Sequence, residues 1–248
     1  MTALAPDFLW LAPLIALLAY TVFGLTGFGS TVIAVPLLAH LVPLKFAVPL
    51  VLLLDAVFGV WAGVRFRRHA QYREIGILLP FLAIGMVAGV TMLVSADERV
   101  LLGVLGACVL GYGIYCLAQP IKTAQISRAW AVPLGALGGV FSAMFGTGGP
   151  VYVAYLSGRI RDKSELRASI ASVLVLTITL RFALFGFAGL LWQDGLWLAW
   201  ILLLPVGALG VWLGNRLHHR LSGADILRLV YGLLVLSGAS LIARVGAG

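Results

Sequence analysis

Long apolar runs, separated by short polar connections, fill almost the whole chain. A helix needs about 20 apolar residues to cross the hydrocarbon core of a membrane. We expect six full crossings, over residues 46–64, 75–94, 100–118, 168–192, 196–214 and 225–243. The longest polar connection, residues 119–129, lies near the middle of the chain. This pattern predicts an all-α polytopic membrane protein with a single transmembrane domain over residues 1–248.

Two other apolar runs are interrupted by glycine-rich stretches. Glycine inside a helix costs about 1 kcal/mol relative to alanine, and clusters of it open the backbone. In hydrocarbon, an opened backbone is tolerated only where protein or a water-filled cavity surrounds it. The first stretch joins residues 8–24 to 30–42, and the second follows residues 130–143. They read Gly24-Leu25-Thr26-Gly27-Phe28-Gly29-Ser30 and Met144-Phe145-Gly146-Thr147-Gly148-Gly149-Pro150.

The two halves of the chain resemble each other. Pro80, Gly85 and Gly89 in the first half have the same spacing as Pro205, Gly210 and Gly214 in the second, 125 residues later. The glycine breaks recur at an offset of 119 residues, from Gly27 to Gly146. We therefore expect an internal duplication, with repeat 1 over residues 8–118 and repeat 2 over residues 130–243.

The distribution of Lys and Arg predicts how the repeats are oriented. If each glycine-broken segment crosses the membrane once, the basic residues divide about equally between the two sides. If each segment enters and returns to its starting side, 13 basic residues lie on one side and 3 on the other. The positive-inside rule favours the second topology. It predicts two inverted repeats, each a glycine-broken re-entrant helical hairpin followed by three full transmembrane helices, with both termini outside the cell.

Composition excludes several classes of protein. The chain is 62% hydrophobic and 10% charged, whereas a soluble domain has about 25% charged residues. Its net charge of +8 comes from residues between the apolar runs, so the positive-inside rule explains it better than a nucleic-acid partner does. Cys108 and Cys116 have no metal-ligand spacing, and no Walker motif for ATP hydrolysis occurs. We expect no metal, no cofactor and no enzymatic activity.

Each glycine break predicts a helix N-terminus directly after it, near Ser30 and near Pro150. Helix N-termini present unpaired N–H groups and a partial positive charge, which attract anions. The alternative is that the glycines only let helices approach closely, an interpretation that we favour for Gly85, Gly89, Gly210 and Gly214. The predicted substrate-binding residues of the two breaks are Thr26, Gly27, Phe28, Gly29 and Ser30 together with Gly146, Thr147, Gly148, Gly149 and Pro150.

Two charged residues lie inside apolar runs. Arg181 would cost at least about 2.5–3.5 kcal/mol there, and such a cost usually marks a transport pathway or a paired charge. Asp55 is expected at a similar depth. One interpretation is a structural Asp55–Arg181 ion pair. The other is that Arg181 attracts the substrate anion while Asp55 carries a coupling proton or governs the release of Arg181. Nearby, Thr177 is expected to bond its own helix. Tyr152 borders the second break and could form a gate or a pocket wall, although we favour packing for it.

The paired glycine breaks and the duplicated Pro-x4-Gly-x3-Gly pattern resemble the TauE/SafE sulfite exporter family over about residues 10–243. The resemblance implies a secondary transporter of the bacterial inner membrane for a small anion such as sulfite, sulfoacetate or another sulfonate. The expected partners are that anion, a coupling ion such as a proton, and the lipid bilayer, and a homo-oligomer is left open. An anion channel and an intramembrane enzyme such as a lipid phosphatase remain alternatives.

Overall fold

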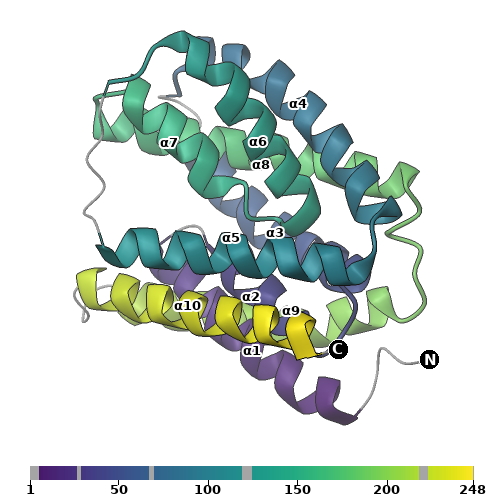
Figure 1. Ribbon diagram of the computed structural model, residues 1–248. Coiled ribbons are helices and arrows are strands. Elements are labelled where there is room, and N and C mark those ends of the chain that lie inside the picture. Colours follow the sequence, from purple (N-terminus) through teal and green to yellow (C-terminus); the bar gives the residue numbers. More distant parts are fainter. Residues whose placement is uncertain (1–5, 27–28, 67–69, 119–124, 218–222, 248) are drawn as a thin grey trace. The chain divides into compact units, whose positions relative to one another are not determined.

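The computed structural model describes residues 6–26, 29–66, 70–118, 125–217 and 223–247, and this part of the chain is helical apart from its connections (Figure 1). The all-α prediction is therefore confirmed. The helices are α1 (Pro6–Thr26), α2 (Ser30–Leu38), α3 (Leu44–Phe66), α4 (Tyr72–Ser95), α5 (Glu98–Ala118), η3 (Arg128–Trp130), α6 (Ala131–Phe145), α7 (Gly149–Arg159), α8 (Lys163–Phe187), α9 (Leu196–Leu217) and α10 (Gly223–Ala247).

Six segments in the described part of the chain are long and apolar enough to cross a membrane. They are α1, α4, α5, α8, α9 and the segment Arg128–Phe145, which joins η3 to α6. The set differs from the six predicted crossings, because it includes α1 and α6 and, among the described residues, leaves out α3 and α10. We predicted α1 and α6 as halves of hairpins, but α1 alone has 21 residues, about 30 Å of helix.

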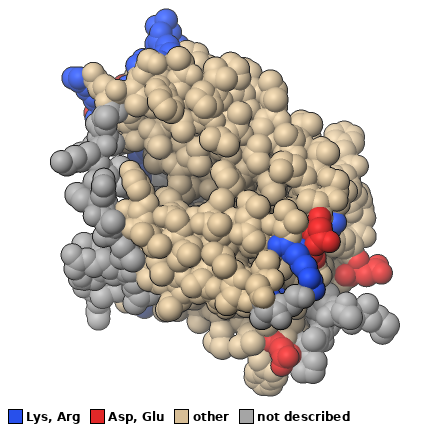
Figure 2. Space-filling model, in the orientation of Figure 1, with Lys and Arg blue, Asp and Glu red and all other residues tan. Residues whose placement is uncertain are grey.

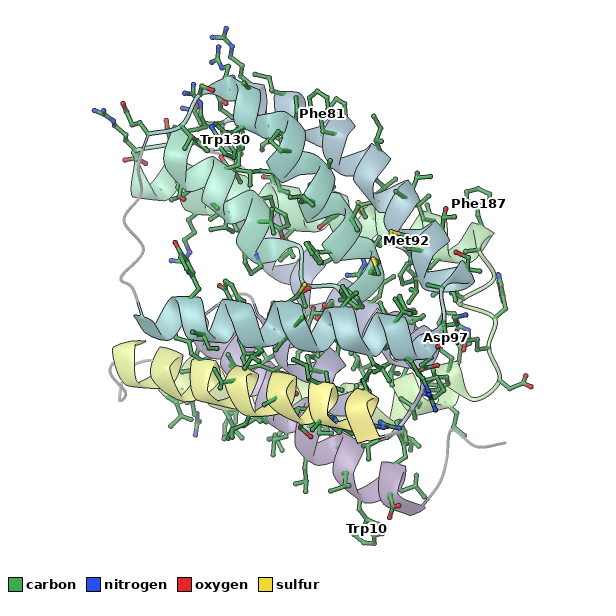
Figure 3. All side chains as sticks on the ribbon, in the orientation of Figure 1. Trp10, Phe81, Met92, Asp97, Trp130 and Phe187 are labelled. Atoms are coloured by element: carbon green, nitrogen blue, oxygen red, sulfur yellow. The ribbon has the colours of Figure 1, made fainter. Side chains whose placement is uncertain are left out.

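Large apolar side chains project outward from these helices. Trp10 is 79% exposed and Phe187 is 93% exposed, and Figure 3 shows both pointing away from the ribbon. Figure 2 likewise shows a broad area without charged side chains. Extended apolar surface is rare on soluble monomers, so these faces suit contact with lipid.

Two helix ends differ from their predicted positions. The helix predicted over residues 168–192 begins earlier, at Lys163, because Asp162 caps it by accepting the N–H groups of Ser164 and Glu165 at 2.9 and 2.8 Å. It ends earlier too, at Phe187. Gly189, with φ of +76°, turns the chain soon after that end.

The chain divides into two compact units, which we describe separately. Unit 1 consists of residues 1–54, 96–121 and 192–248, and it holds α1, α2, α5, α9, α10 and the first half of α3. Unit 2 consists of residues 55–95 and 122–191, and it holds α4, η3, α6, α7, α8 and the second half of α3. Each unit thus combines helices from both predicted repeats.

In unit 2, α4 and α6 pack along each other through glycines (Figure 1). A Cβ atom at Gly85 would collide with the carbonyl of Ala136, and one at Gly89 would lie 2.6 Å from the carbonyl oxygen of Val140. Contacts advance in the same direction along both helices, so α4 and α6 run parallel. The packing interpretation of Gly85 and Gly89 is therefore confirmed.

In unit 1, α1 and α9 pack in the same way. A Cβ atom at Gly210 would lie 2.8 Å from the carbonyl oxygen of Leu17, and one at Gly214 would collide with the carbonyl of Thr21. These helices also run parallel, and the packing interpretation is confirmed for these two glycines as well.

The two helix pairs use corresponding residues of the duplicated pattern. Gly85 and Gly210 are 125 residues apart, and the residues that they meet, Ala136 and Leu17, are 119 residues apart. The contacts of Gly89 and Gly214 correspond by the same two offsets. The first helix of one predicted repeat therefore packs on the fourth helix of the other, once in each unit.

The last helices of the two predicted repeats, α5 and α10, pack antiparallel in unit 1 (Figure 1). A Cβ atom at Gly106 would lie near Leu241 and Ile242, whereas one at Gly113, further along α5, would lie near Tyr231 and Val235. Positions later in α5 therefore contact positions earlier in α10, as in an antiparallel pair.

Candidate functional site

The first glycine break separates α1 from α2 in unit 1. α1 ends at Thr26 and α2 begins at Ser30, as the predicted N-terminus requires, while the predicted site residues Gly27 and Phe28 lie outside the described residues. Gly29 precedes α2 with φ of +94°, a backbone conformation that favours glycine. The Ser30 side chain is buried directly after it.

The second glycine break separates α6 from α7 in unit 2. Gly146 ends α6 with φ of +72°, and the N–H groups of Gly146 and Thr147 donate to the carbonyls of Ser142 and Phe141 at 2.9 and 3.3 Å. The bond from Gly146 to Ser142, with Gly146 in the left-handed region, is the αL capping motif, which satisfies one of the last carbonyls of a helix. α7 then begins at Gly149, with Pro150 in its first turn, as predicted.

α7 folds back along α6 to form a helical hairpin. A Cβ atom at Gly148 would collide with the carbonyl of Gly138 and lie 2.6 Å from Cβ of Ser142. Further along α7, Val151 lies 3.6 Å from the Cβ position of Gly138. Gly148 is therefore required for packing at the turn of the hairpin, whatever it also does for a ligand.

The N–H group of Gly146, a predicted donor, is used within the protein, and the start of α7 has further positions without a free N–H group. Pro150 has no N–H group, and the N–H groups of Val151 and Tyr152 donate to the carbonyl of Gly148 at 3.1 and 3.3 Å. These three positions therefore provide no N–H group to a ligand, and side chains become more important near this terminus.

Two buried charged residues of unit 2, Asp55 and Arg181, act electrostatically on the hydroxyl of Tyr152 at the start of α7. The Cβ position of Gly149 is 3.6 Å from the same hydroxyl oxygen. Arg181 is 3% exposed and Asp55 is 7% exposed, so both charges are enclosed by the protein.

The guanidinium of Arg181 contacts the ring of Phe185, with Cζ 5.5 Å from the ring centroid. Its Nε and Nη2 atoms make no hydrogen bond to the residues that the structure describes, although Arg181 has further interactions in the protein. A buried guanidinium that is held partly by an aromatic face can still direct N–H groups toward an anion.

The sequence did not reveal a second polar cluster, around Glu74 at the start of α4. This buried carboxylate accepts hydrogen bonds from Arg128 at 2.9 Å, Arg159 at 3.3 Å and the hydroxyl of Tyr155 at 2.9 Å. Arg159 also donates to the carbonyl of Ile126 at 3.0 Å. The cluster fastens the far end of α7 to α4 and to the segment before α6. The sequence did contain one signal for this cluster: Glu74 is a carboxylate at the edge of an apolar run in a chain whose polar connections are rich in arginine.

The predicted site residues are thus divided between the units. Unit 1 contains the first break, Thr26–Ser30, and unit 2 contains the second break, Gly146–Pro150, together with Asp55 and Arg181. Asp55 and Arg181 both lie within electrostatic range of Tyr152, just after the second break, and whether the two charges pair stays a prediction. That the two breaks share one pocket stays a prediction. Among the described residues, no three His, Cys, Asp or Glu side chains gather closely enough to hold a metal ion.

Comparisons with known proteins match nearly the whole chain. The model of the family described as Sulfite exporter TauE/SafE matches residues 12–241. A probable inner membrane transporter protein TsaS from Comamonas testosteroni is 32% identical over 193 residues, which is 77% of this chain and 81% of that protein. A probable sulfite/organosulfonate exporter TauE from Cupriavidus necator is 26% identical over 224 residues, or 88% and 87% of the two chains. No solved structure matches.

Proposed function

Because the chain belongs to the TauE/SafE sulfite exporter family, we propose that it is a secondary transporter for a small oxyanion or organosulfonate, such as sulfite or sulfoacetate. It would act in the bacterial inner membrane. The relative from Cupriavidus necator is named for sulfite and organosulfonate, and membrane-length apolar helices fit a multi-pass protein.

The observation that carries the proposal is the buried cation of unit 2. Arg181 is 3% exposed and lies within electrostatic range of the first turn of α7, where the hairpin begins to fold back. A permanent positive charge inside an apolar run usually marks a transport pathway or a paired charge, and it would attract an anion that entered beside it. The sequence also predicts that Thr26–Ser30 faces the anion, and that prediction is part of the proposal.

The proposed transport cycle is alternating access by two inverted repeats. Inverted repeats with broken helices are a recurrent design among secondary transporters. The corresponding contacts of Gly85 with Ala136 and of Gly210 with Leu17 support a duplicated architecture.

The direction of α5 and α10 supports re-entrant hairpins. If each glycine-broken segment crossed the membrane once, these two helices would cross in the same direction. If each hairpin returns to its starting side, they cross in opposite directions, in agreement with their antiparallel packing. In that topology both termini are periplasmic.

Counterflow in proteoliposomes tests the proposal. Vesicles containing the purified protein are loaded with unlabelled sulfite under anaerobic conditions and diluted into a trace of ³⁵S-sulfite, and the same assay is repeated with sulfoacetate. A carrier exchanges internal anion for external label, so we expect the internal label to pass through a transient maximum above its equilibrium level. Entry of label without that maximum would indicate a channel. No entry beyond that of protein-free vesicles, for either anion, would contradict the proposal.

A further inference from the structure

Glu74 joins α4 to both ends of the helical hairpin that α6 and α7 form in unit 2. It lies in the first turn of α4 and is 4% exposed. Arg128, in η3 directly before α6, donates to its carboxylate at 2.9 Å. Tyr155 and Arg159, near the end of α7, donate to the same carboxylate at 2.9 and 3.3 Å. Hydrogen bonds to an ionised group are roughly twice as strong as those between neutral groups, so this carboxylate fastens the open end of the hairpin to α4.

The two ends of the hairpin are also bonded to each other. Nη1 of Arg159 donates to the carbonyl of Ile126 at 3.0 Å, and the N–H group of Ile126 donates to the carbonyl of Gly158 at 3.3 Å. These bonds join the end of α7 to the segment before η3. The ends of the hairpin are therefore held together, and Glu74 holds both of them against α4.

Glycines of both helices hold the rest of α6 against α4. A Cβ atom at Gly139 would collide with the carbonyl of Leu82, and one at Gly135 would lie 2.9 Å from Cβ of Phe81. Gly85 of α4 approaches the backbone of α6 equally closely. Close-packed contacts of this kind leave no room for one backbone to slide past the other, so α6 keeps its position along α4 unless the two helices separate.

We infer that Glu74 is a positioning residue for transport: it holds the α6–α7 hairpin on α4, so that these three helices keep one arrangement throughout the cycle. The inference rests on the proposed function, because it concerns the transport cycle. The second glycine break lies at the turn of this hairpin, and Glu74 acts on it only through the hairpin. Because α4 belongs to the first predicted repeat and the hairpin to the second, the rigid part of unit 2 combines helices of both repeats.

Reversible disulfides test whether the hairpin stays in place. Cβ of Val151 lies 3.6 Å from the Cβ position of Gly138, within the range of disulfides, so Gly138→Cys/Val151→Cys links α7 to α6. Phe81→Cys/Gly135→Cys links α4 to α6. In a background without the native cysteines, we expect oxidised and reduced protein to exchange ³⁵S-sulfite and labelled sulfoacetate at the same initial rate. The linked fraction is counted after the assay, because sulfite itself can cleave a disulfide.

Two outcomes of this experiment would contradict the inference. Loss of exchange on oxidation, with recovery after reduction, would mean that the hairpin must open or leave α4 during transport. A pair that does not oxidise would mean that its two positions are not in contact. The single variants Gly138→Cys and Phe81→Cys, treated with the same oxidant, control for effects of oxidation alone.

Charge removal tests the part played by Glu74 itself. Glu74→Gln keeps the shape of the side chain but removes the charge that three donors share. A hydrogen bond to a charged group is worth enough that its loss changes an equilibrium by roughly tenfold or more. If the anion binds only the anchored hairpin, a smaller population of that form weakens apparent affinity in proportion. We therefore expect Glu74→Gln to raise the KM for ³⁵S-sulfite by that factor, with Vmax nearly unchanged.

A matched control is Glu165→Gln, which alters a carboxylate bonded to the side chain of Gln71 and should keep the wild-type KM. If Glu74→Gln does not fold, as judged by size exclusion and Tm, Tyr155→Phe removes one of the three donors and should raise the KM by a smaller factor. A lower Tm with an unchanged KM would show that Glu74 only stabilises the fold, and would overturn its positioning role.

The wild-type protein separates the two proposals. If it exchanges sulfite or sulfoacetate while the oxidised pairs do not, only the inference fails and the proposed function stands. A wild-type protein that exchanges neither anion would overturn both.

Discussion

A buried arginine beside a buried carboxylate can stabilise the fold as an ion pair, or it can bind a ligand while the carboxylate regulates it. Arg181 and Asp55 were found from the sequence because a charge inside an apolar run is conspicuous there. Both are buried in unit 2. For Tyr152, packing was favoured over a role in a gate or pocket wall, because an aromatic residue in a membrane helix shows no pattern that distinguishes the two roles. Glu74 was missed because it lies where an apolar run begins.

Neutralising both charges distinguishes the two interpretations of Arg181. Arg181→Met alone should lower sulfite transport by roughly tenfold or more, because a charged hydrogen-bond donor is lost. If Arg181 binds the anion, the double variant Asp55→Asn/Arg181→Met should transport sulfite as slowly as Arg181→Met does. Recovery of transport in the double variant would show that Arg181 serves only to neutralise Asp55. Initial rates in proteoliposomes, normalised to folded protein, measure this.

At the scale of helices, glycine spacing predicted which faces approach closely, but it did not predict the partners. The carbonyls of Ala136 and Leu17 meet Gly85 and Gly210 from helices that are distant in sequence. A local pattern reveals a small residue without revealing what fills the space beside it. Helix ends were predicted well where glycine breaks a run. They were predicted less well at α8. Asp162 caps this helix, so it begins at Lys163 and its first turn includes charged residues that precede the apolar run.

Two alanine substitutions on α4 test this packing. At Gly85 a Cβ atom would collide with a backbone carbonyl, whereas at Gly76 no atom lies within 4 Å of the Cβ position. We expect Gly85→Ala to lower the free energy of unfolding by about 1–3 kcal/mol, the usual cost of overpacking. Gly76→Ala should leave it unchanged or raise it by up to about 1 kcal/mol through helix propensity. Thermal unfolding in detergent compares them, and equal Tm values would contradict the close contact.

At the scale of the whole molecule, the offsets of 119 and 125 residues in the sequence anticipated the corresponding helix contacts in the two units. They did not anticipate that each unit would combine helices of both repeats, because which helices pair depends on tertiary packing rather than on local periodicity. The distribution of Lys and Arg also predicted the topology, because it favoured hairpins that return to their starting side. The antiparallel packing of α5 and α10 agrees with that topology.

Cysteine accessibility in whole cells tests the re-entrant topology most directly. In a background with Cys108 and Cys116 replaced by serine, single variants are treated with a membrane-impermeant thiol reagent before and after permeabilisation. Arg73→Cys and Arg161→Cys should react only after permeabilisation, because both connections are cytoplasmic if each hairpin returns to its starting side. Asp97→Cys and Asp194→Cys, in outer turns, should react in intact cells. If Arg73→Cys and Arg161→Cys reacted from opposite faces of the membrane, the second hairpin would cross it, and the account would be wrong.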